Sequence, residues 1–260
     1  MAAKINHKKQ MPVEEYRLPD EAFSRTDVRR RRTISNGVKL LDLGLIDYLD
    51  ALNKQKELLC RIKSGNDTDT LILCEHNHVF TLGRRAKEEN ILCGIEGARK
   101  IGVDVIPVDR GGDVTYHGKG QLVAYMIFDL RKDKKDLSLF LRRLERVVLG
   151  VLNDYGIRGS LIEGRRGVWV NKKKIASIGI GVSGWVTYHG LSFNINTDLK
   201  FFSMINPCGY RDVEMVSLSE ILNAYVDLVA VKAAFINNLA KVFERNVKTG
   251  GIYVKNDLFT

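Results

Sequence analysis

Most strand-type patterns in this chain are gathered into two blocks and do not alternate regularly with helices, and this arrangement limits its fold more than any other feature. The two blocks span 103–129 and 168–194. Between them, Leu137 to Tyr155 carries apolar residues at helical spacing and ends at Gly156, which predicts one long amphipathic helix. A doubly wound parallel sheet needs strands and helices in regular alternation. We therefore predict an α+β domain with a mixed β-sheet core flanked by helices.

Local signals place further elements around this core. A helix is predicted from about Asp47 to Lys63, and the apolar run Thr70–Cys74 predicts a strand buried on both faces. Ser217 and Glu220 form a capping-box pattern for a short helix. Asp227 is expected to cap a last helix that runs through Phe243.

The first 35 residues differ from the rest of the chain. They show no sustained hydrophobic period and end in the basic run Arg29–Arg32, so we predict a flexible basic extension (1–35) followed by a single folded domain (36–260). The chain has 41 basic and 31 acidic side chains, a net charge of +10, which favours acidic partners. Acidic residues at 14, 15, 20 and 21 argue against a transit peptide, and we expect a cytoplasmic protein.

Four cysteines without a CxxC pair indicate a reducing compartment. Cys60, Cys74 and Cys93 lie in helical or apolar settings and are expected to be buried, inert thiols. Cys208 differs because Pro207 and Gly209 predict a turn, which places the sulfur on a loop. An incidental turn thiol is the alternative interpretation.

A cysteine nucleophile acts as the thiolate, so it needs a nearby positive charge or base. Lys174, His117 and His189 are the candidates. Lys174 follows two lysines, a pattern typical of a solvated turn, but it also begins a strand, where one residue of register decides which face it occupies. Each histidine precedes a glycine, although a lone histidine is more often structural.

Other motifs give weaker signals. The pattern Gly179-x-Gly181-x-x-Gly184 is followed by strand-forming residues where a dinucleotide-binding turn needs a helix. His76 and His78 lack further ligands in a metal-binding pattern, and no GxxxxGK[ST] loop is present. We expect no metal and no nucleotide-binding P-loop.

Five ordered blocks of sequence resemble the motifs of the lipoyl(octanoyl) transferases. The resemblance covers about Val38 to Asn223. The blocks are EHNHVFTLGR at 75–84, RGGDVTYHGKGQ at 110–121, KIASIG at 174–179, HGLSFN at 189–194 and NPCG at 206–209.

This resemblance implies a fold related to the biotin and lipoate protein ligases and a two-step acyl transfer without ATP or any cofactor. Cys208 is expected to accept an octanoyl group from acyl carrier protein as a thioester, and Lys174 to lower the thiol pKa and move a proton. The acceptor is then a lysine on the lipoyl domain of a 2-oxoacid dehydrogenase or on the glycine cleavage H protein. The residues expected to surround the acyl chain are Arg110, Gly111, Gly112, Asp113, Val114, Thr115, Tyr116, His117, Ser177, Ile178, Gly179, Gly190, Leu191 and Ser192. We expect a monomer with neither a membrane nor a nucleic-acid partner.

Three departures from the family pattern bear on these expectations. Lys119 replaces a usual proline, the pair Asn77-His78 replaces two prolines, and Ser192 replaces a usual alanine. Ser192 in particular bears on the acyl length that the protein accepts. Two alternatives remain open at this stage, namely an ATP-dependent lipoate or biotin ligase of the same fold and a non-enzymatic, basic RNA-binding or carrier-binding module.

Overall fold

The computed structural model describes residues 10–12, 37–206 and 213–252. In these residues the strands form a nine-stranded sheet, in the order β1-β8-β9-β10-β11-β7-β3-β2-β12, and a three-stranded sheet, in the order β5-β4-β6. The strands are β1 (Gln10–Pro12), β2 (Gly37–Leu45), β3 (Thr70–Glu75), β4 (Val79–Leu82), β5 (Asp104–Pro107), β6 (Val114–His117), β7 (Gln121–Ile127), β8 (Ser160–Ile162), β9 (Arg165–Val170), β10 (Lys173–Ser183), β11 (Val186–Asn194) and β12 (Asn246–Ile252). The helices are α1 (Tyr48–Lys63), α2 (Gly94–Lys100), α3 (Leu137–Asp154), α4 (Leu218–Leu222) and α5 (Leu228–Phe243), with short 3-10 turns at Glu88–Asn90, Leu130–Lys132 and Leu199–Met204.

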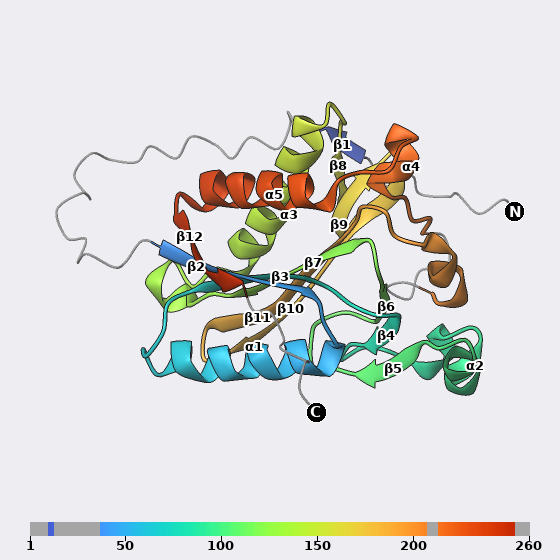
Figure 1. Cartoon of the computed structure of the whole chain (residues 1–260), viewed down its shortest axis with the longest axis horizontal. Helices are drawn as coiled ribbons and strands as arrows, with labels where there is room; N and C mark the ends of the chain where they lie inside the picture. The colour runs from blue at the N-terminus through green and yellow to red at the C-terminus, as the bar shows by residue number, and fades with distance from the viewer. Residues whose placement is uncertain (1–9, 13–36, 207–212, 253–260) are drawn as a thin grey trace, which may run out of the picture.

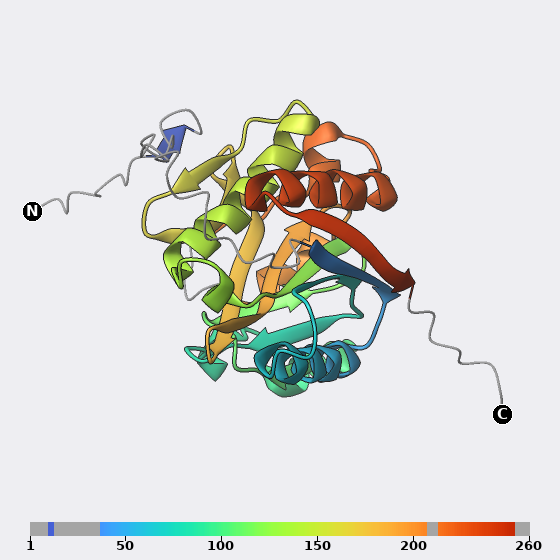
Figure 2. The same cartoon turned by 90° about the vertical axis from the view of Figure 1, so that its left-hand side faces the viewer.

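Helices cover both faces of the large sheet. Figure 1 shows α3 and α5 on one face and α1 on the other, and Figure 2 shows the same layers from the side. The larger apolar cluster packs the sheet against α3 and α5 through residues such as Leu144 and Phe235. A second cluster packs the opposite face against Leu58 and Ile62 of α1. The small sheet, with α2, extends from the α1 side of the molecule.

The large sheet is mixed, as predicted. Strand β2 pairs in parallel with β3 and with β12, whereas the pairs from β3 through β7, β11, β10 and β9 to β8 are antiparallel. The predicted α+β class is therefore confirmed.

Short polar signals fix the ends of several elements. The Asp47 carboxylate accepts from the backbone N–H of Leu49 at 2.8 Å and begins α1, and Asp227 caps α5 in the same way. The predicted capping box at Ser217 is formed. Asn171 and Lys172 both have positive φ, as a two-residue hairpin turn requires, so β10 begins at Lys173.

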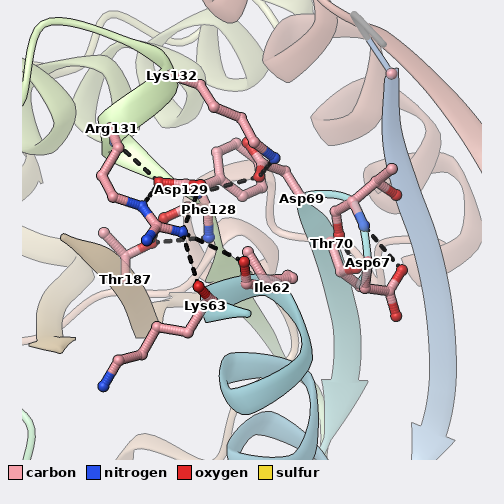
Figure 3. Close-up of polar contacts among 12 residues, drawn as sticks. Ile62, Lys63, Asp67, Asp69, Thr70, Phe128, Asp129, Arg131, Lys132 and Thr187 are labelled. Atoms are coloured by element: carbon pink, nitrogen blue, oxygen red, sulfur yellow. Dashed lines mark hydrogen bonds and ion pairs between the residues drawn. The ribbon is translucent and has the colours of Figure 1, made fainter. Parts of the chain in front are cut away.

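The buried carboxylate of Asp69, just before the start of β3, connects several elements at that end of the fold. Asp69 is 1% exposed and bonds Lys132 Nζ at 3.1 Å and Arg245 at 2.5 Å, and it accepts from the backbone N–H of Asp129. The neighbouring Arg131 binds the Asp129 carboxylate and donates to the carbonyl of Lys63 at the end of α1 (Figure 3). These contacts join the start of β3, the end of β7, the end of α1 and the approach to β12.

The extension predicted for 1–35 falls almost entirely outside the described residues. Residues 10–12 form β1, which pairs antiparallel with β8. Within the described ranges, no helix has the length and apolar character needed to cross a bilayer.

Candidate active site

A pocket lies on the α1 face of the large sheet, where β10 and β11 pass the loop that precedes β6. Every residue expected to surround an acyl chain lines this pocket except Tyr116. The lining residues are Tyr48, Arg110, Gly111, Gly112, Asp113, Val114, Thr115, His117, Val123, Tyr125, Ser177, Ile178, Gly179, His189, Gly190, Leu191 and Ser192.

Glycines make room for this pocket. Gly179 of β10 lies directly opposite Gly190 of β11, so neither strand presents a side chain at that level of the sheet. A Cβ atom at Gly179 would lie 2.9 Å from the carbonyl oxygen of Gly111, and one at Gly190 would collide with the carbonyl of Ala124. Larger residues at these positions would therefore displace the loop or the neighbouring strand.

A β-bulge sets the direction of Lys174. Lys174 pairs with Trp169, but the next pair is Ala176 with Val168, so β10 holds one extra residue here. Ala176 and Val168 pack in the core under α3 and α5, and residues that are directly opposed in a sheet share a face. Lys174 and Trp169 therefore occupy the other face, which is also the face of Ser177 and Gly179. Without the bulge, Lys174 would share the face of Ala176.

The Lys174 side chain is enclosed although it carries an ammonium group. It is 3% exposed, and its Nζ lies 5.5 Å from the centroid of the Trp169 ring. Gly167 has φ +118°, and a Cβ there would come within 2.6 Å of Lys174 Cε, so the absence of a side chain at Gly167 leaves space for the lysine stem. Lys173, in contrast, is half-exposed and pairs with Glu214 at 3.0 Å.

The Arg110 guanidinium holds the glycine-rich loop in place. It is buried, and it donates to the carbonyl and hydroxyl oxygens of Thr81 at 2.7 and 2.9 Å and to the carbonyl of Gly111 at 3.1 Å. The backbone N–H of Gly111 bonds the carbonyl of Ile180, which fixes the loop against β10. A buried guanidinium group keeps its positive charge beside the pocket.

Uncharged histidines and tyrosines form another part of the wall. Burial lowers the pKa of His117 to about 3 and that of His76 to about 4, so both rings are neutral at neutral pH. His76 donates from Nδ1 to the carbonyl of Ile46 at 2.9 Å and accepts from the Tyr125 hydroxyl at 2.7 Å. His117 stacks on Tyr48, and burial raises the pKa of Tyr48 to about 12.

Other predicted residues lie elsewhere. Tyr116 is buried against Phe201 and bonds His78, away from the pocket lining. The glycine pattern at 179–184 lies on β10 and its turn and does not open a helix. Among the described residues, no cluster of three or more histidine, cysteine or acidic side chains is arranged to hold a metal ion.

The expectation of three buried thiols is correct only for Cys74. Cys60 and Cys93 are exposed, so the prediction is wrong for both. Cys60 lies on the outer face of α1, because the helical period turns Leu58 and Ile62 inward instead. Cys93 directly precedes α2 and does not continue the apolar run before it.

Cys208 lies outside the described residues, but both flanks of its segment are anchored near the pocket. Before it, Asn206 donates from its backbone N–H to the carbonyl of Asn90 at 2.8 Å, and the Asn90 amide bonds Asp113 of the pocket lining at 2.7 Å. After it, the carbonyl of Glu214 accepts from the backbone N–H of Lys174 at 2.7 Å. The chain therefore enters and leaves this segment beside the pocket and Lys174.

Sequence reasoning missed three residues of the pocket lining. Tyr48 lies within the predicted helix at 47–63, and Val123 and Tyr125 lie within the predicted strand block at 103–129, so neither pattern indicated a pocket. Their polarity and spacing do not distinguish a pocket wall from a core. A tyrosine within an otherwise apolar strand is the one signal that could have drawn attention to Tyr125.

Comparison with known proteins assigns the family. The model of the lipoyl protein ligase A/B catalytic domain matches residues 47–240. An octanoyltransferase of Solibacter usitatus is 43% identical over 211 residues, which cover 81% of this chain and 95% of that protein. One of Syntrophobacter fumaroxidans is 43% identical over 207 residues, which cover 80% and 91%.

Solved structures agree on the fold. A bipartite lipoate protein ligase from Thermoplasma acidophilum superposes with a TM-score of 0.66 at 17% identity, covering 84% of this chain and 88% of that one. A lipoate-protein ligase A bound with ATP superposes with a TM-score of 0.64 at 16% identity, covering 85% and 90%. The chain belongs to the lipoyl protein ligase A/B catalytic-domain family and, within it, to the octanoyltransferases, which are acyltransferases.

Proposed function

We propose that this acyltransferase moves an octanoyl group from acyl carrier protein to a lysine of a lipoyl domain through a thioester on Cys208. The placement of Lys174 is the observation that carries this proposal. The bulge in β10 directs a buried ammonium group to the pocket face, and Glu214, six residues after Cys208, bonds the Lys174 backbone.

The first step forms the acyl-enzyme. The Cys208 thiolate attacks the thioester carbonyl of the donor, the bond to the carrier sulfur breaks, and that sulfur leaves as a thiolate that takes up a proton. An ammonium group beside a cysteine favours its thiolate, and Lys174 is the group assigned to this role. The same lysine is the proton donor for the departing sulfur.

The second step transfers the acyl group to nitrogen. A neutral lysine amine of the acceptor attacks the Cys208 thioester, the carbon–sulfur bond breaks, and the amine proton is released as the amide forms. Conversion of a thioester to an amide is downhill, so no nucleotide is required. The glycine-rich backbone at Gly111 and Gly179 is well suited to approach the acyl group closely.

The partners are proposed in the same terms. The donor is octanoyl-acyl carrier protein, and the acceptors are lipoyl domains of 2-oxoacid dehydrogenases and the glycine cleavage H protein. The net charge of +10 is suited to steering acidic partners, although it does not identify them. A monomeric state, a cytoplasmic location and a single domain at 36–260 remain predictions.

Intact-mass analysis after incubation with octanoyl carrier protein, without ATP, tests the thioester. A mass increase of one octanoyl group is expected and should be absent from Cys208→Ala. Cys60→Ala and Cys93→Ala are matched controls, because both thiols are exposed and should leave the adduct unchanged. An adduct that survives in Cys208→Ala, or that requires ATP, contradicts the proposal.

The role of Lys174 has its own matched control in the preceding residue. Lys174→Ala should slow acylation and raise the pH at which Cys208 reacts with iodoacetamide. Lys173→Ala removes an adjacent, half-exposed lysine and should change neither property. Equal effects of the two substitutions would indicate general charge loss and would remove Lys174 from its assigned role.

A further inference from the structure

His189 has a backbone conformation that non-glycine residues rarely adopt. Its φ is +59°, and it lies within β11, where successive side chains normally point to opposite faces. Yet the Tyr188 hydroxyl and His189 Nε2 bond the same carboxylate, that of Asp109, at 2.7 and 2.9 Å. The positive φ therefore breaks the alternation and brings both rings to the pocket face. Such outliers persist only where the surroundings hold them firmly.

Three contacts hold the His189 ring and backbone. Asp109 binds Nε2, the Tyr188 ring lies 4.9 Å from the imidazole centroid, and the backbone N–H donates to Gln55 Oε1 at 2.8 Å. The side chain is 2% exposed. A ring fixed in this way cannot turn aside when a ligand reaches it.

The protonation states of Asp109 and His189 follow from their burial and their hydrogen bonds. Burial opposes ionisation of Asp109, but hydrogen bonds from His189 and Tyr188 outweigh this effect, so the pKa of Asp109 is lowered. Burial also lowers the pKa of His189, which keeps the ring neutral. An ionised carboxylate only accepts, so the single ring proton lies on Nε2 and Nδ1 is an acceptor.

One buried polar atom of the pocket lining has no partner among the described residues. It is Nδ1 of His189, an acceptor. An unpaired acceptor on a pocket-lining ring can receive a hydrogen bond from a hydroxyl group.

His189 marks the end of the pocket opposite Lys174. It pairs with Ile180, which lies six residues beyond Lys174 on β10. On β11 the pocket lining runs from Ser192, its residue nearest Lys174, to His189, and at the usual rise of a strand these two levels are roughly 10 Å apart. The glycine pair Gly179 and Gly190 lies between them, beside the space assigned to the acyl chain.

We propose that the His189 ring, fixed by Asp109, is the distal end wall of the acyl pocket and sets the longest alkyl chain that the enzyme accepts. This inference rests on the proposed acyl transfer. An alkyl chain longer than the pocket would have to enter the space that the fixed His189 ring occupies. Its terminal methyl group would also leave His189 Nδ1 unpaired, whereas a terminal hydroxyl would donate a hydrogen bond to it.

Selectivity between carrier-bound acyl groups tests the wall. The measured quantities are the ratio of kcat/KM for decanoyl over octanoyl and the ratio for 8-hydroxyoctanoyl over nonanoyl, two groups of nearly equal length. His189→Gly should raise the first ratio roughly fifteenfold, the factor for burying two further methylene groups. It should lower the second ratio about tenfold, because the hydrogen-bonding wall is lost. Glycine adopts the positive φ readily, so this variant is expected to fold.

Two further variants keep the test decisive. Asp109→Ala leaves the pocket lining intact and releases the ring, so it should shift both ratios in the same directions by smaller factors. Asn171→Gly replaces another positive-φ residue, in the β9–β10 turn, and should leave both ratios unchanged. If His189→Gly and Asp109→Ala both transfer octanoyl groups and both selectivity ratios stay at their native values, the proposal that His189 is the end wall is contradicted. The proposed acyl transfer would not be affected by that result. Absence of transfer by the native protein would overturn the proposed function itself.

Discussion

Lys174 lies directly opposite Trp169 across strands β10 and β9, with its ammonium nitrogen 5.5 Å from the centroid of the indole. The contact pairs a buried cation with the face of the aromatic ring that attracts cations most strongly. This contact also limits where the ammonium group can move, because the aliphatic part of the Lys174 side chain passes Gly167 on one side. The position of the proposed proton-transferring group therefore depends on a neighbouring strand as well as on its own.

Replacing Trp169 should slow acylation in addition to lowering the stability of the fold, because the indole is buried. Trp169→Leu removes the ring face and about 0.5–2 kcal/mol of cation–π attraction, which leaves the ammonium less confined. We expect a several-fold slower octanoylation in stopped-time mass measurements. Trp185→Leu is the control, since that tryptophan is 41% exposed in the β10–β11 turn. Equal rates for the two variants would show that the indole does not position Lys174.

Gly167→Ala should displace the lysine stem. The new methyl would crowd both Lys174 Cε and the carbonyl of Ala176, in addition to the strain at positive φ. Gly156→Ala also places an alanine at positive φ, +71° compared with +118° at Gly167, but with no atom within 4 Å of the new methyl, so it measures backbone strain without a collision. We expect urea denaturation to show a loss of about 1 kcal/mol for Gly156→Ala and a larger loss for Gly167→Ala. Only Gly167→Ala should also slow acylation.

Acid should destabilise the fold below about pH 6.5, the ordinary pKa of histidine. The folded-state pKa of His76 is about 4 and that of His117 about 3, so the unfolded chain binds more protons between these values and pH 6.5. Stability is then full above pH 6.5 and falls as the pH is lowered, by up to about 1.4 kcal/mol per pH unit for each histidine. Chemical denaturation at several pH values measures this slope. His76→Gln should reduce it, and an unchanged slope would contradict a neutral, buried His76.

Asp69→Ala should destabilise the protein without affecting catalysis directly. The substitution leaves Lys132, Arg245 and the Asp129 N–H without their shared acceptor, which costs about 3–5 kcal/mol for a buried pair. Glu57→Ala breaks only exposed ion pairs on α1 and should cost less than about 1 kcal/mol. Thermal unfolding compares the two. The fraction of Asp69→Ala that remains folded should have the native kcat. A lower kcat would show that the contacts of Asp69 influence the pocket.

Features governed by local sequence were predictable from the sequence, and features governed by register were not. The cap at Asp227 and the box at Ser217 depend on nearby backbone groups, so their residue types were sufficient. The bulge after Lys174 depends on how β9 and β10 align, and the alternation pattern alone leaves the face of Lys174 open.

The pocket likewise has residues that could be predicted from the sequence and features that could not. The resemblance to the family's ordered motifs predicted most of the residues that line the pocket. The positive φ of His189 and its shared carboxylate at Asp109 result from tertiary packing. Neither feature could be predicted from residue types, because a histidine before a glycine is equally compatible with a regular strand.

The parallel pairing of β2 with β12 also affects how the chain is made. Asn246 pairs with Gly37, so one of the first described strands acquires its outer neighbour from the last one. During synthesis, residues 37–45 therefore have an unpaired backbone edge until residues 246–252 have left the ribosome. Contacts so distant in sequence form slowly, and an open edge is a template for pairing with another chain. Shielding of that edge by a chaperone during translation would protect the nascent protein from aggregation.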